Sequence, residues 1–410
     1  MLSYSGRSRA EERRIRGGYQ MLRFMTAGES HGKCLTGILE GLPAGLVVDK
    51  DFIDMQLQRR QVGYGRGARM KIEKDEIDIT AGVRFGRTLG SPVCFVIHNR
   101  DWQNWEKIMS SSPVVEGADK RSVTRPRPGH VDLPGALKYH TYDARDVLER
   151  ASARETAARV SGGAFCQLFL RSFGIRVGSH VIAIGSERVS DEIASLDTQR
   201  VLELDPLSPV RCADPAAEER MKSLIDGAKQ AGDTLGGVVE AVACSVPPGL
   251  GTHAQWDRRF DGRLAQAMMS IPAAKGVEIG EGIEGASRPG SAVHDEIYYD
   301  HENHRFYRNT NRAGGIEAGI TNGSDIRVRI YMKPIPTLRR ALMSVDLRTK
   351  EAFKAQFERS DTCVVPAAAV IAEAMLAIVL SEAFLEKFGG DTVEETRANL
   401  SGYLKGLCEY

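Results

Sequence analysis

The sequence of 410 residues lacks the features that mark secreted, zinc-stapled or membrane proteins. Its seven cysteines are odd in number and include no Cys-x-x-Cys pair, so they indicate neither a disulfide framework nor a structural zinc site. Reduced thiols inside a cytoplasmic protein are the better interpretation. The most apolar stretch, residues 364–380, is interrupted by Pro366 and Glu373 and falls short of the ~20 residues of a membrane span, so it predicts a buried helix.

An excess of one charge is also missing. The 55 Lys and Arg are balanced by 54 Asp and Glu, which leaves a formal net charge of +1. No overall field therefore draws the chain to nucleic acid or to an acidic membrane, and we predict neither as a partner. Any site for an anion has to come from local clusters of arginine.

Several familiar catalytic motifs do not occur. The sequence has no Walker A loop, no Gly-x-Gly-x-x-Gly opening a helix after a strand, and no Gly-x-Ser-x-Gly elbow. His301 and His304 are three positions apart rather than the four of a zinc-protease helix, so we predict no metal site.

The first twenty residues are rich in arginine and lack the apolar run of a secretory signal. Glu11 and Glu12 count against an organellar transit peptide. We expect residues 1–20 to be a disordered extension, with Met21 as the candidate functional start and one domain over residues 21–410.

Helical and strand patterns alternate after Met21 without a low-complexity linker, which indicates a mixed α and β fold. Residues 152–173 have helical spacing of apolar positions, and residues 175–184 have the β-branched content of a strand. A second helix, capped by Asp214-Pro215, precedes a strand over residues 238–246. These two helix-then-strand units suggest an internal duplication.

Two histidines lie on loops where they could carry protons. His31 is flanked by glycines in Gly28–Gly32, and His130 follows prolines and arginines in residues 125–132. A histidine in such a position can act as an acid or a base near neutral pH. The plainer interpretation of His31 is a loop histidine hydrogen-bonded to backbone.

Two further segments suit anions. Residues 59–69 hold four arginines, three glycines and Tyr64, a composition that could bind phosphate, or single-stranded RNA with Tyr64 stacked on a base, or could be a solvated basic loop. Residues 150–156 open a helix with Ser152 as a candidate N-cap, where N–H groups can bind phosphate. A plain helix cap is the simpler alternative there.

The C-terminal half adds the glycine-rich residues 311–323, then Lys333–Thr337, then Arg359 and Asp361. Dense Gly-Gly and Asn-Gly pairs are typical of tight turns or of backbone packed against a flat ligand. The residues alone therefore predict an α/β enzyme that acts on a small polyanion, with two histidines as proton carriers.

Taken together and in order, these segments resemble the chorismate synthase family. The matching segments are GESHG (28–32), RRQVGYGRG (59–67), RPRPGHVD (125–132), RASARETAARV (150–160), FDGRLAQAMMSIPAAKGVEIG (260–280), NRAGGIEAGITNG (311–323), KPIPT (333–337) and ERSDTCVVPAAAV (358–370). Each segment alone could arise by chance, but the ordered set covers nearly the whole chain from Met21.

The resemblance implies roles for individual residues. His31 and His130 match the two catalytic histidines, and Asp361 matches the aspartate that assists proton removal. The positions matching contacts to reduced flavin mononucleotide (FMN) are Arg150, Ala151, Ser152, Gln266, Ala267, Ala318, Lys333, Pro334, Ile335, Pro336, Thr337 and Arg359. Arg60 and Arg66 match arginines assigned to substrate phosphate or to NADPH, and Arg127 and Arg154 resemble ligands of substrate carboxylate and phosphate.

Two positions depart from the family pattern. Ala318 stands where the family usually has glycine, so the backbone there is expected to sit differently. Pro336 replaces the serine of the usual KPIST, which removes a hydroxyl and an N–H donor that could otherwise bind FMN.

The resemblance also implies an activity and a fold. The activity is a carbon–oxygen lyase reaction, the reduced-FMN-dependent 1,4-elimination of phosphate from 5-enolpyruvylshikimate-3-phosphate to give chorismate. The expected fold is of the α+β class, a β-α-β sandwich with helices between antiparallel sheets, internally duplicated and assembled as a homotetramer. Because no long insertion is present, NADPH is expected to act only indirectly, through a separate flavin reductase.

Other classes stay open on the sequence alone. An RNA-binding or scaffold protein could use residues 59–69, and another FMN-binding oxidoreductase or a phosphatase could use the same arginines and histidines. A yellow colour and strong affinity for reduced FMN would separate these classes.

Deletion of residues 1–20 is expected to leave the melting temperature and the activity nearly unchanged. The reason is that a polar terminus ahead of the first strand buries little apolar surface. Thermal unfolding of the full and truncated chains measures this, and a fall of several degrees on truncation would mean instead that the segment packs against the protein.

Overall fold

Two antiparallel sheets form the outer layers of the molecule. The computed structural model describes residues 22–66, 74–113, 118–190, 193, 197–356 and 361–410. The first sheet has the strand order β1-β2-β6-β3, with bounds Arg23–Ala27, Cys34–Glu40, Val93–His98 and Asp78–Ala81. The second has the order β10-β15-β9-β7-β8, with bounds Ala274–Ile279, Ile326–Met332, Gly237–Cys244, Arg176–Ile184 and Glu187–Arg188.

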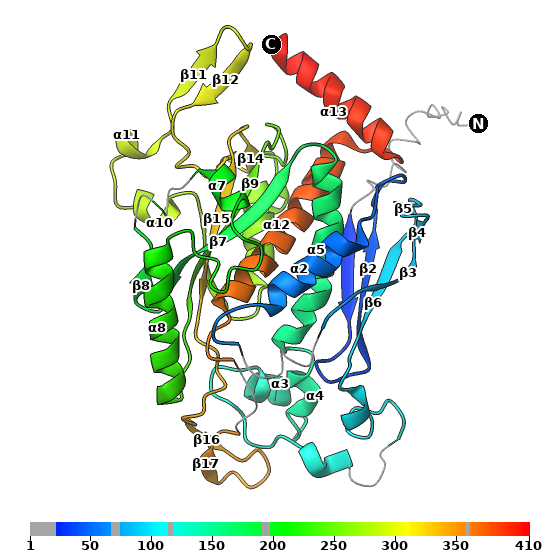
Figure 1. Cartoon of the computed structure of the whole chain (residues 1–410), viewed down its shortest axis with the longest axis vertical. Helices are drawn as coiled ribbons and strands as arrows, with labels where there is room; N and C mark the ends of the chain where they lie inside the picture. The colour runs from blue at the N-terminus through cyan, green and yellow to red at the C-terminus, as the bar shows by residue number, and fades with distance from the viewer. Residues whose placement is uncertain (1–21, 67–73, 114–117, 191–192, 194–196, 357–360) are drawn as a thin grey trace, which may run out of the picture.

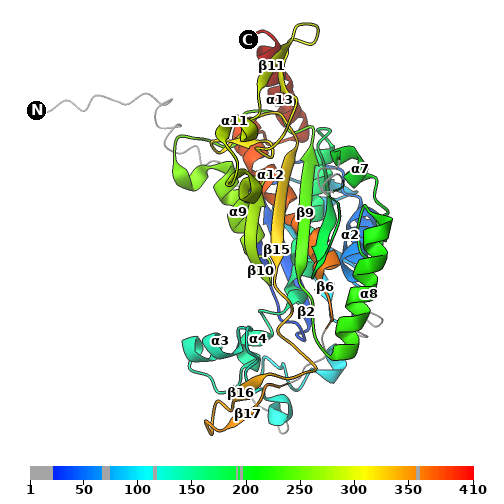
Figure 2. The same cartoon turned by 90° about the vertical axis from the view of Figure 1, so that its left-hand side faces the viewer.

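Helices fill the space between the two sheets (Figure 1). Figure 2 shows β10, β15 and β9 in front of α12, with the strands of the other sheet behind. The inner helices are α2 (Lys50–Gln61), α5 (Thr156–Arg171) and α12 (Val365–Phe388), and α9 (Phe260–Met269) packs against α12 and β10. This arrangement confirms the predicted sandwich of helices between antiparallel sheets.

A close approach of α5 to α12 holds the layers together. At Gly163 of α5, an added Cβ would lie 2.4 Å from the Cβ of Ala374 in α12. Glycine is required here because any side chain would push the two helices apart. The main core draws on residues from Leu22 to Leu400, which supports the proposal that residues 21–410 form one domain.

The buried helix predicted over residues 364–380 is confirmed, but its predicted length was wrong. The helix α12 runs to Phe388 and is not interrupted by Pro366 or Glu373. Pro366 lies in the first turn, where no intrahelical N–H is lost. By length and composition α12 could cross a membrane, yet 83% of its most apolar window is buried among other elements of the protein, and an all-round apolar helix is typical of such a core position.

The other predicted elements appear close to their expected bounds. Asp214 caps α8 (Pro215–Ala231) by accepting hydrogen bonds from the N–H groups of Ala216 and Ala217. The two helix-then-strand units are α5 with β7 and α8 with β9, but α5 lies between the sheets whereas α8 lies along β8 at the sheet edge. Because these positions are not equivalent, the internal duplication stays a prediction.

A small lobe extends from the lower end of the sandwich in Figure 1. We call it the α3–α4 lobe, and it contains α3 (Asp132–Tyr139), α4 (Arg145–Leu148), β16 (Met343–Val345) and β17 (Ala352–Lys354). Its separate core consists of Val123, Ala136, Ala144, Val147, Leu148 and Leu347.

Short elements and a terminal helix complete the chain. They are β4 (Val83–Arg84), β5 (Arg87–Thr88), η2 (Trp102–Asn104), η3 (Ala118–Arg121), η4 (Ala153–Glu155), α7 (Thr198–Leu202), η5 (Trp256–Arg258), α10 (Gly282–Gly285), α11 (Gly290–Val293), β11 (Ile297–Asp300), β12 (Arg305–Arg308), β13 (Ile316–Glu317), β14 (Ile320–Thr321) and α13 (Val393–Cys408).

A carboxylate lies at the centre of the sandwich. Glu373 of α12 accepts hydrogen bonds from Arg59 at 2.7 and 2.8 Å, from Arg211 at 3.1 Å and from the Ser179 hydroxyl at 2.6 Å. Burial alone would raise the pKa of Glu373, but the charges of Arg59 and Arg211 more than offset this and hold it below its ordinary value. The interaction joins α12 to α2 and β7.

Glu373→Ala is expected to destabilise the fold by about 3–5 kcal/mol, because it leaves the buried Arg59 and Arg211 without their carboxylate. Thermal or urea unfolding measures the loss. Glu382→Ala is a matched control, since Glu382 lies on the same helix and pairs with Arg263 nearer the surface, where about 1 kcal/mol or less is expected.

The stabilisation by Glu373 should also depend on pH. Its folded pKa is lowered, so its contribution is complete above its ordinary pKa and is lost as pH falls through the folded value. Equal losses in the Glu373 and Glu382 variants would contradict a central role for the buried carboxylate.

Candidate active site

His31 lies on the turn between β1 and β2 and is held by a carboxylate. Gly28 has a φ of +107°, and a Cβ there would lie 2.4 Å from the Cys34 carbonyl oxygen, so the turn requires glycine. His31 Nδ1 lies 2.9 and 3.0 Å from the two carboxylate oxygens of Glu149. The His31 backbone N–H also donates to Glu149 at 2.9 Å. The ring is therefore bound to a carboxylate rather than to backbone, which removes the plainer interpretation of this histidine.

Glu149 is itself clamped from its other side. Arg145 of α4 donates to it at 2.7 Å, and both side chains are nearly fully buried. Burial alone would raise the pKa of Glu149, but the hydrogen bonds from His31 and Arg145 hold it below its ordinary value. The carboxylate is therefore ionised at neutral pH.

His130 belongs to a group of the same chemical composition. Its Nδ1 lies 2.5 Å from Asp132, and the Arg127 guanidinium donates to the same carboxylate at 2.8 and 3.0 Å. Asp132 is fully buried, which alone would raise its pKa, but the hydrogen bonds from His130 and Arg127 lower it. Both candidate histidines thus contact an arginine-bound carboxylate through Nδ1.

The segment Lys333–Thr337 follows β15 and lies against the His130 loop. Arg127 donates to the Thr337 hydroxyl at 3.0 Å, and Lys333 donates to the Gly129 carbonyl. Pro336 lies 3.6 Å from the position of a Cβ on Gly129, so its ring packs against this loop. The Ile335 carbonyl accepts from Thr234, which ties the segment to the end of α8.

Arg60 and Arg154 share another carboxylate. Arg60 donates to the Thr156 hydroxyl and the Ala153 carbonyl, each at 2.9 Å, and its guanidinium lies 3.7 Å from Asp75. Arg154 pairs with the same Asp75 carboxylate. Arg66 forms a third arginine pair, with Asp361 at 2.8 Å.

The interpretation of residues 59–69 as a solvated basic loop is wrong for its first residues. Arg59 and Arg60 lie in the last turn of α2 and are largely buried. Tyr64 donates its hydroxyl to Asp226 of α8 at 2.8 Å. The Arg59 guanidinium is therefore used inside the protein, and the hydroxyl of the half-buried Tyr64 is bound to Asp226.

A small cavity lies beside these arginines. Arg60, Arg66 and Thr156 form its polar side, and its apolar side is formed by Ala153, Ile271, Pro272, Met332, Val364, Ala367, Ala368 and Ile371. Met332, which lines the cavity, directly precedes Lys333, the first residue of the segment that contacts the His130 loop.

The segment Arg150–Thr156 joins the His31 group to this cavity. Ser152 caps η4 by accepting from the Arg154 N–H, and its hydroxyl lies 3.1 Å from that of Ser30, which confirms the predicted cap. Arg150 donates to the carbonyls of Thr26 and Gly28, so its guanidinium stabilises the end of β1. Ala151 is half-buried between them.

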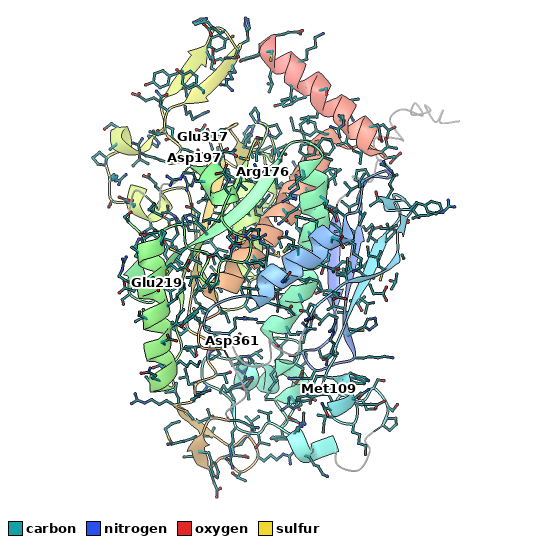
Figure 3. The ribbon with its side chains drawn as sticks, in the orientation of Figure 1. Met109, Arg176, Asp197, Glu219, Glu317 and Asp361 are labelled. Carbon is teal, nitrogen blue, oxygen red and sulfur yellow. The ribbon has the colours of Figure 1, made fainter. Side chains whose placement is uncertain are left out.

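Three predicted flavin-contact positions lie elsewhere in the described chain. Gln266 is exposed on α9 and Ala267 is half-buried against the core. Ala318 follows Glu317, and Figure 3 places Glu317 in the upper part of the molecule and Asp361 below its centre. Arg359 lies outside the described residues.

Sequence reasoning did not identify Glu149, Trp105, Arg145 or Asp75. Glu149 directly precedes the matched segment 150–160, and Asp132 is the last residue of the matched segment 125–132. Their positions beside or within these segments could have identified both carboxylates from the sequence. Trp105 stacks on His31 with ring centroids 3.6 Å apart. Nothing in the linear sequence relates Trp105 or Asp75 to their distant partners.

Comparisons with known proteins all lead to the same protein family. A family model described as chorismate synthase matches residues 22–385. The chorismate synthases of Geobacter sulfurreducens and Solibacter usitatus are 58% and 56% identical, over 94% and 95% of this chain and 99% and 100% of theirs. A solved structure described as a crystal structure of chorismate synthase matches with a TM-score of 0.77 at 45% identity, over 95% of this chain and 99% of that one.

Ala318→Gly is expected to raise the free energy of unfolding by about 1 kcal/mol, because Ala318 has a φ of +49° in the turn between β13 and β14. Urea unfolding of the two proteins measures the change. Ala313→Gly is the control, since Ala313 is not among the described residues with positive φ; it should lose about 0.5–1 kcal/mol. A less stable Ala318→Gly protein would contradict strain at this turn.

Proposed function

The chain belongs to the chorismate synthase family of lyases, and we propose that its two histidine groups and the adjoining arginines eliminate phosphate from 5-enolpyruvylshikimate-3-phosphate to give chorismate. The observation that carries this proposal is the convergence of two Arg–carboxylate–His groups near an arginine-lined cavity. Such groups suit a reaction that needs proton transfer on a polyanion.

The arginines suit the charge of this substrate. It carries one phosphate and two carboxylates, each of which a guanidinium can bind through two parallel hydrogen bonds. Arg60, Arg66, Arg127 and Arg154 are proposed as the ligands of these groups. Each guanidinium lies within reach of a protein carboxylate, so it is already oriented before an anion arrives.

The residues around the cavity have the chemical character that a site for reduced FMN needs, although the cavity itself, at about 30 Å³, is much smaller than a flavin. A flavin needs an apolar surface for its flat ring and polar donors for its phosphate, and the cavity has both kinds of lining. Ser152 and Lys333–Thr337 are proposed as the nearest cofactor ligands, with Pro336 contributing packing only because it has no N–H. When bound, reduced FMN would supply the electron density that helps to expel phosphate from a carbon whose hydrogen is barely acidic.

Each titratable residue is assigned one task. His31 is proposed to donate a proton to the departing phosphate oxygen. His130, held by Asp132, would keep a proton beside the cofactor, and Asp361, oriented by Arg66, would assist removal of the substrate proton. General acid catalysis of this kind contributes about 10²–10⁴-fold to a rate.

Further properties follow the family resemblance. We propose a cytoplasmic homotetramer that obtains reduced flavin from a separate reductase, so that NADPH acts only indirectly. Exposed aromatic side chains on the β11–β12 hairpin, among them Tyr298, Phe306 and Tyr307, support association with further copies. Gln266, Ala267, Ala318 and Arg359 stay predictions as FMN contacts.

Chorismate formation should require reduced FMN under anaerobic conditions, without net consumption of flavin. Phosphate release and chorismate absorbance are measured with chemically reduced FMN, with oxidised FMN and with none. The expected rate is high only in the first case. Turnover without any flavin would rule out the proposed cofactor, and phosphate release without chorismate would favour a phosphatase instead.

A further inference from the structure

The carboxylate that holds His31 is part of a buried network with a defined shape. Glu149 uses its two oxygens for three donors: the His31 ring, the His31 backbone N–H and Arg145. It is 1% exposed. A carboxylate in such a position can only accept hydrogen bonds, so the proton shared with the His31 ring belongs on Nδ1 whenever the ring is neutral.

This arrangement determines which ring nitrogen can act on a substrate. Nδ1 points to Glu149 inside the protein, and Nε2 is the ring nitrogen on the side away from that carboxylate. The carboxylate also stabilises the imidazolium form by direct charge attraction, as in other carboxylate–histidine pairs. A proton that His31 delivers to an anion would therefore leave from Nε2.

A second residue fixes the plane of the ring. Trp105 stacks on His31 at a centroid distance of 3.6 Å and an angle of 21°. Trp105 is itself held by a hydrogen bond from its Nε1 to Asp101 at 3.0 Å and by the Arg121 guanidinium 4.1 Å from its ring. The contacts of Glu149 with Nδ1 alone would leave the imidazole free to turn about the direction from Nδ1 to the carboxylate. The stacked Trp105 ring restricts this rotation.

We propose that Glu149 and Trp105 are positioning residues that fix the tautomer and plane of His31, so that Nε2 delivers the proton to the leaving phosphate. The inference rests on the proposed function for the identity of the proton acceptor. The placement of the ring itself rests only on the contacts of Glu149 and Trp105.

The charged groups around His31 decide the expected pH dependence. They are Glu149 and Arg145 from the end of α4, and Asp101 and Arg121 around Trp105. Of these, Glu149 contacts the His31 ring directly, through Nδ1. Glu149→Gln removes this negative charge at nearly constant shape, so the pH profile of kcat should change in this variant.

The first test measures kcat and KM against pH for wild type, Glu149→Gln, His31→Ala and the double variant, with reduced FMN supplied. Glu149→Gln should lower kcat about 10- to 1,000-fold with little change in KM, a range set by general acid catalysis. The alkaline limb of its pH profile should move to lower pH. In the His31→Ala background the same substitution should have almost no further effect, because the two residues act as one unit.

A matched control exists in the second sheet. Glu240 is also buried and also binds a histidine and arginines, namely His180 at 3.1 Å, Arg327 and Arg329. Its pKa is lowered to about 2, because the hydrogen bond from His180 and the charges of Arg327 and Arg329 outweigh the opposing effect of burial. Glu240→Gln should lower the melting temperature but leave the pH profile of kcat in place.

The second test does not depend on activity. In wild-type protein labelled with ¹⁵N at histidine, the His31 signals are identified by their loss in His31→Ala. At a pH where His31 is neutral, the proton should reside on Nδ1, and Glu149→Gln or Trp105→Leu should mix the two tautomers. This measurement also decides the matter if a variant at Glu149 folds poorly, since the wild-type spectrum alone assigns the tautomer.

Three results would overturn the inference. They are a wild-type His31 proton on Nε2, a Glu149→Gln enzyme with wild-type kcat, and an equal loss of kcat from Glu149→Gln with and without His31. Failure of the proposed function looks different: wild type would then form no chorismate with reduced FMN, while the ¹⁵N signals would still show the tautomer that Glu149 selects.

Discussion

The ion pair between Glu373 and Arg59 is the contact on which the arrangement of the site depends. It joins the central helix α12 to the last turn of α2, and Ser179 and Arg211 bring β7 and a neighbouring loop to the same carboxylate. Arg60 is the next residue after Arg59 in the last turn of α2, so the charge pair of Arg59 also helps to position the side chain that contacts Thr156. A core built from apolar contacts alone would fix the layers but not the rotation of α2 about its axis.

The same chemistry recurs at four buried carboxylates of the described residues. Glu149, Asp132, Glu240 and Glu373 are each bound by at least one arginine, and three of them also bind a histidine. A buried carboxylate without such partners would be strongly destabilising, and an arginine without one would be equally so. The local pairing explains how a chain of net charge +1 can still contain an arginine-rich site. The two proposed catalytic histidines differ from His180 in exposure: His31 and His130 retain 16% and 18% side-chain exposure, whereas His180 has none.

Local signals in the sequence predicted the elements well. Caps such as Asp214-Pro215 and Ser152, and the β-branched content of residues 175–184, act within a few residues and were found where expected. The segments that meet at the site were also recognisable, because each is continuous in sequence. Their partners were not: Glu149 lies 118 residues from His31 and Asp75 lies 79 residues from Arg154, and only the folded chain brings them together.

The position of the site between two bodies of the protein has a mechanical consequence. The sandwich supplies Arg60, Thr156 and Met332, whereas the α3–α4 lobe, with its separate core, supplies Asp132 and Arg145. The contacts of Arg127 with Thr337 and of Lys333 with Gly129 connect the two through a pair of segments, one with prolines at positions 126 and 128 and the other with prolines at positions 334 and 336. Prolines restrict φ and lower the entropy of the unfolded loop, so they favour one relative placement of lobe and sandwich. The histidine on the sandwich turn and the histidine on the lobe can therefore keep a fixed separation although no single secondary-structure element carries both.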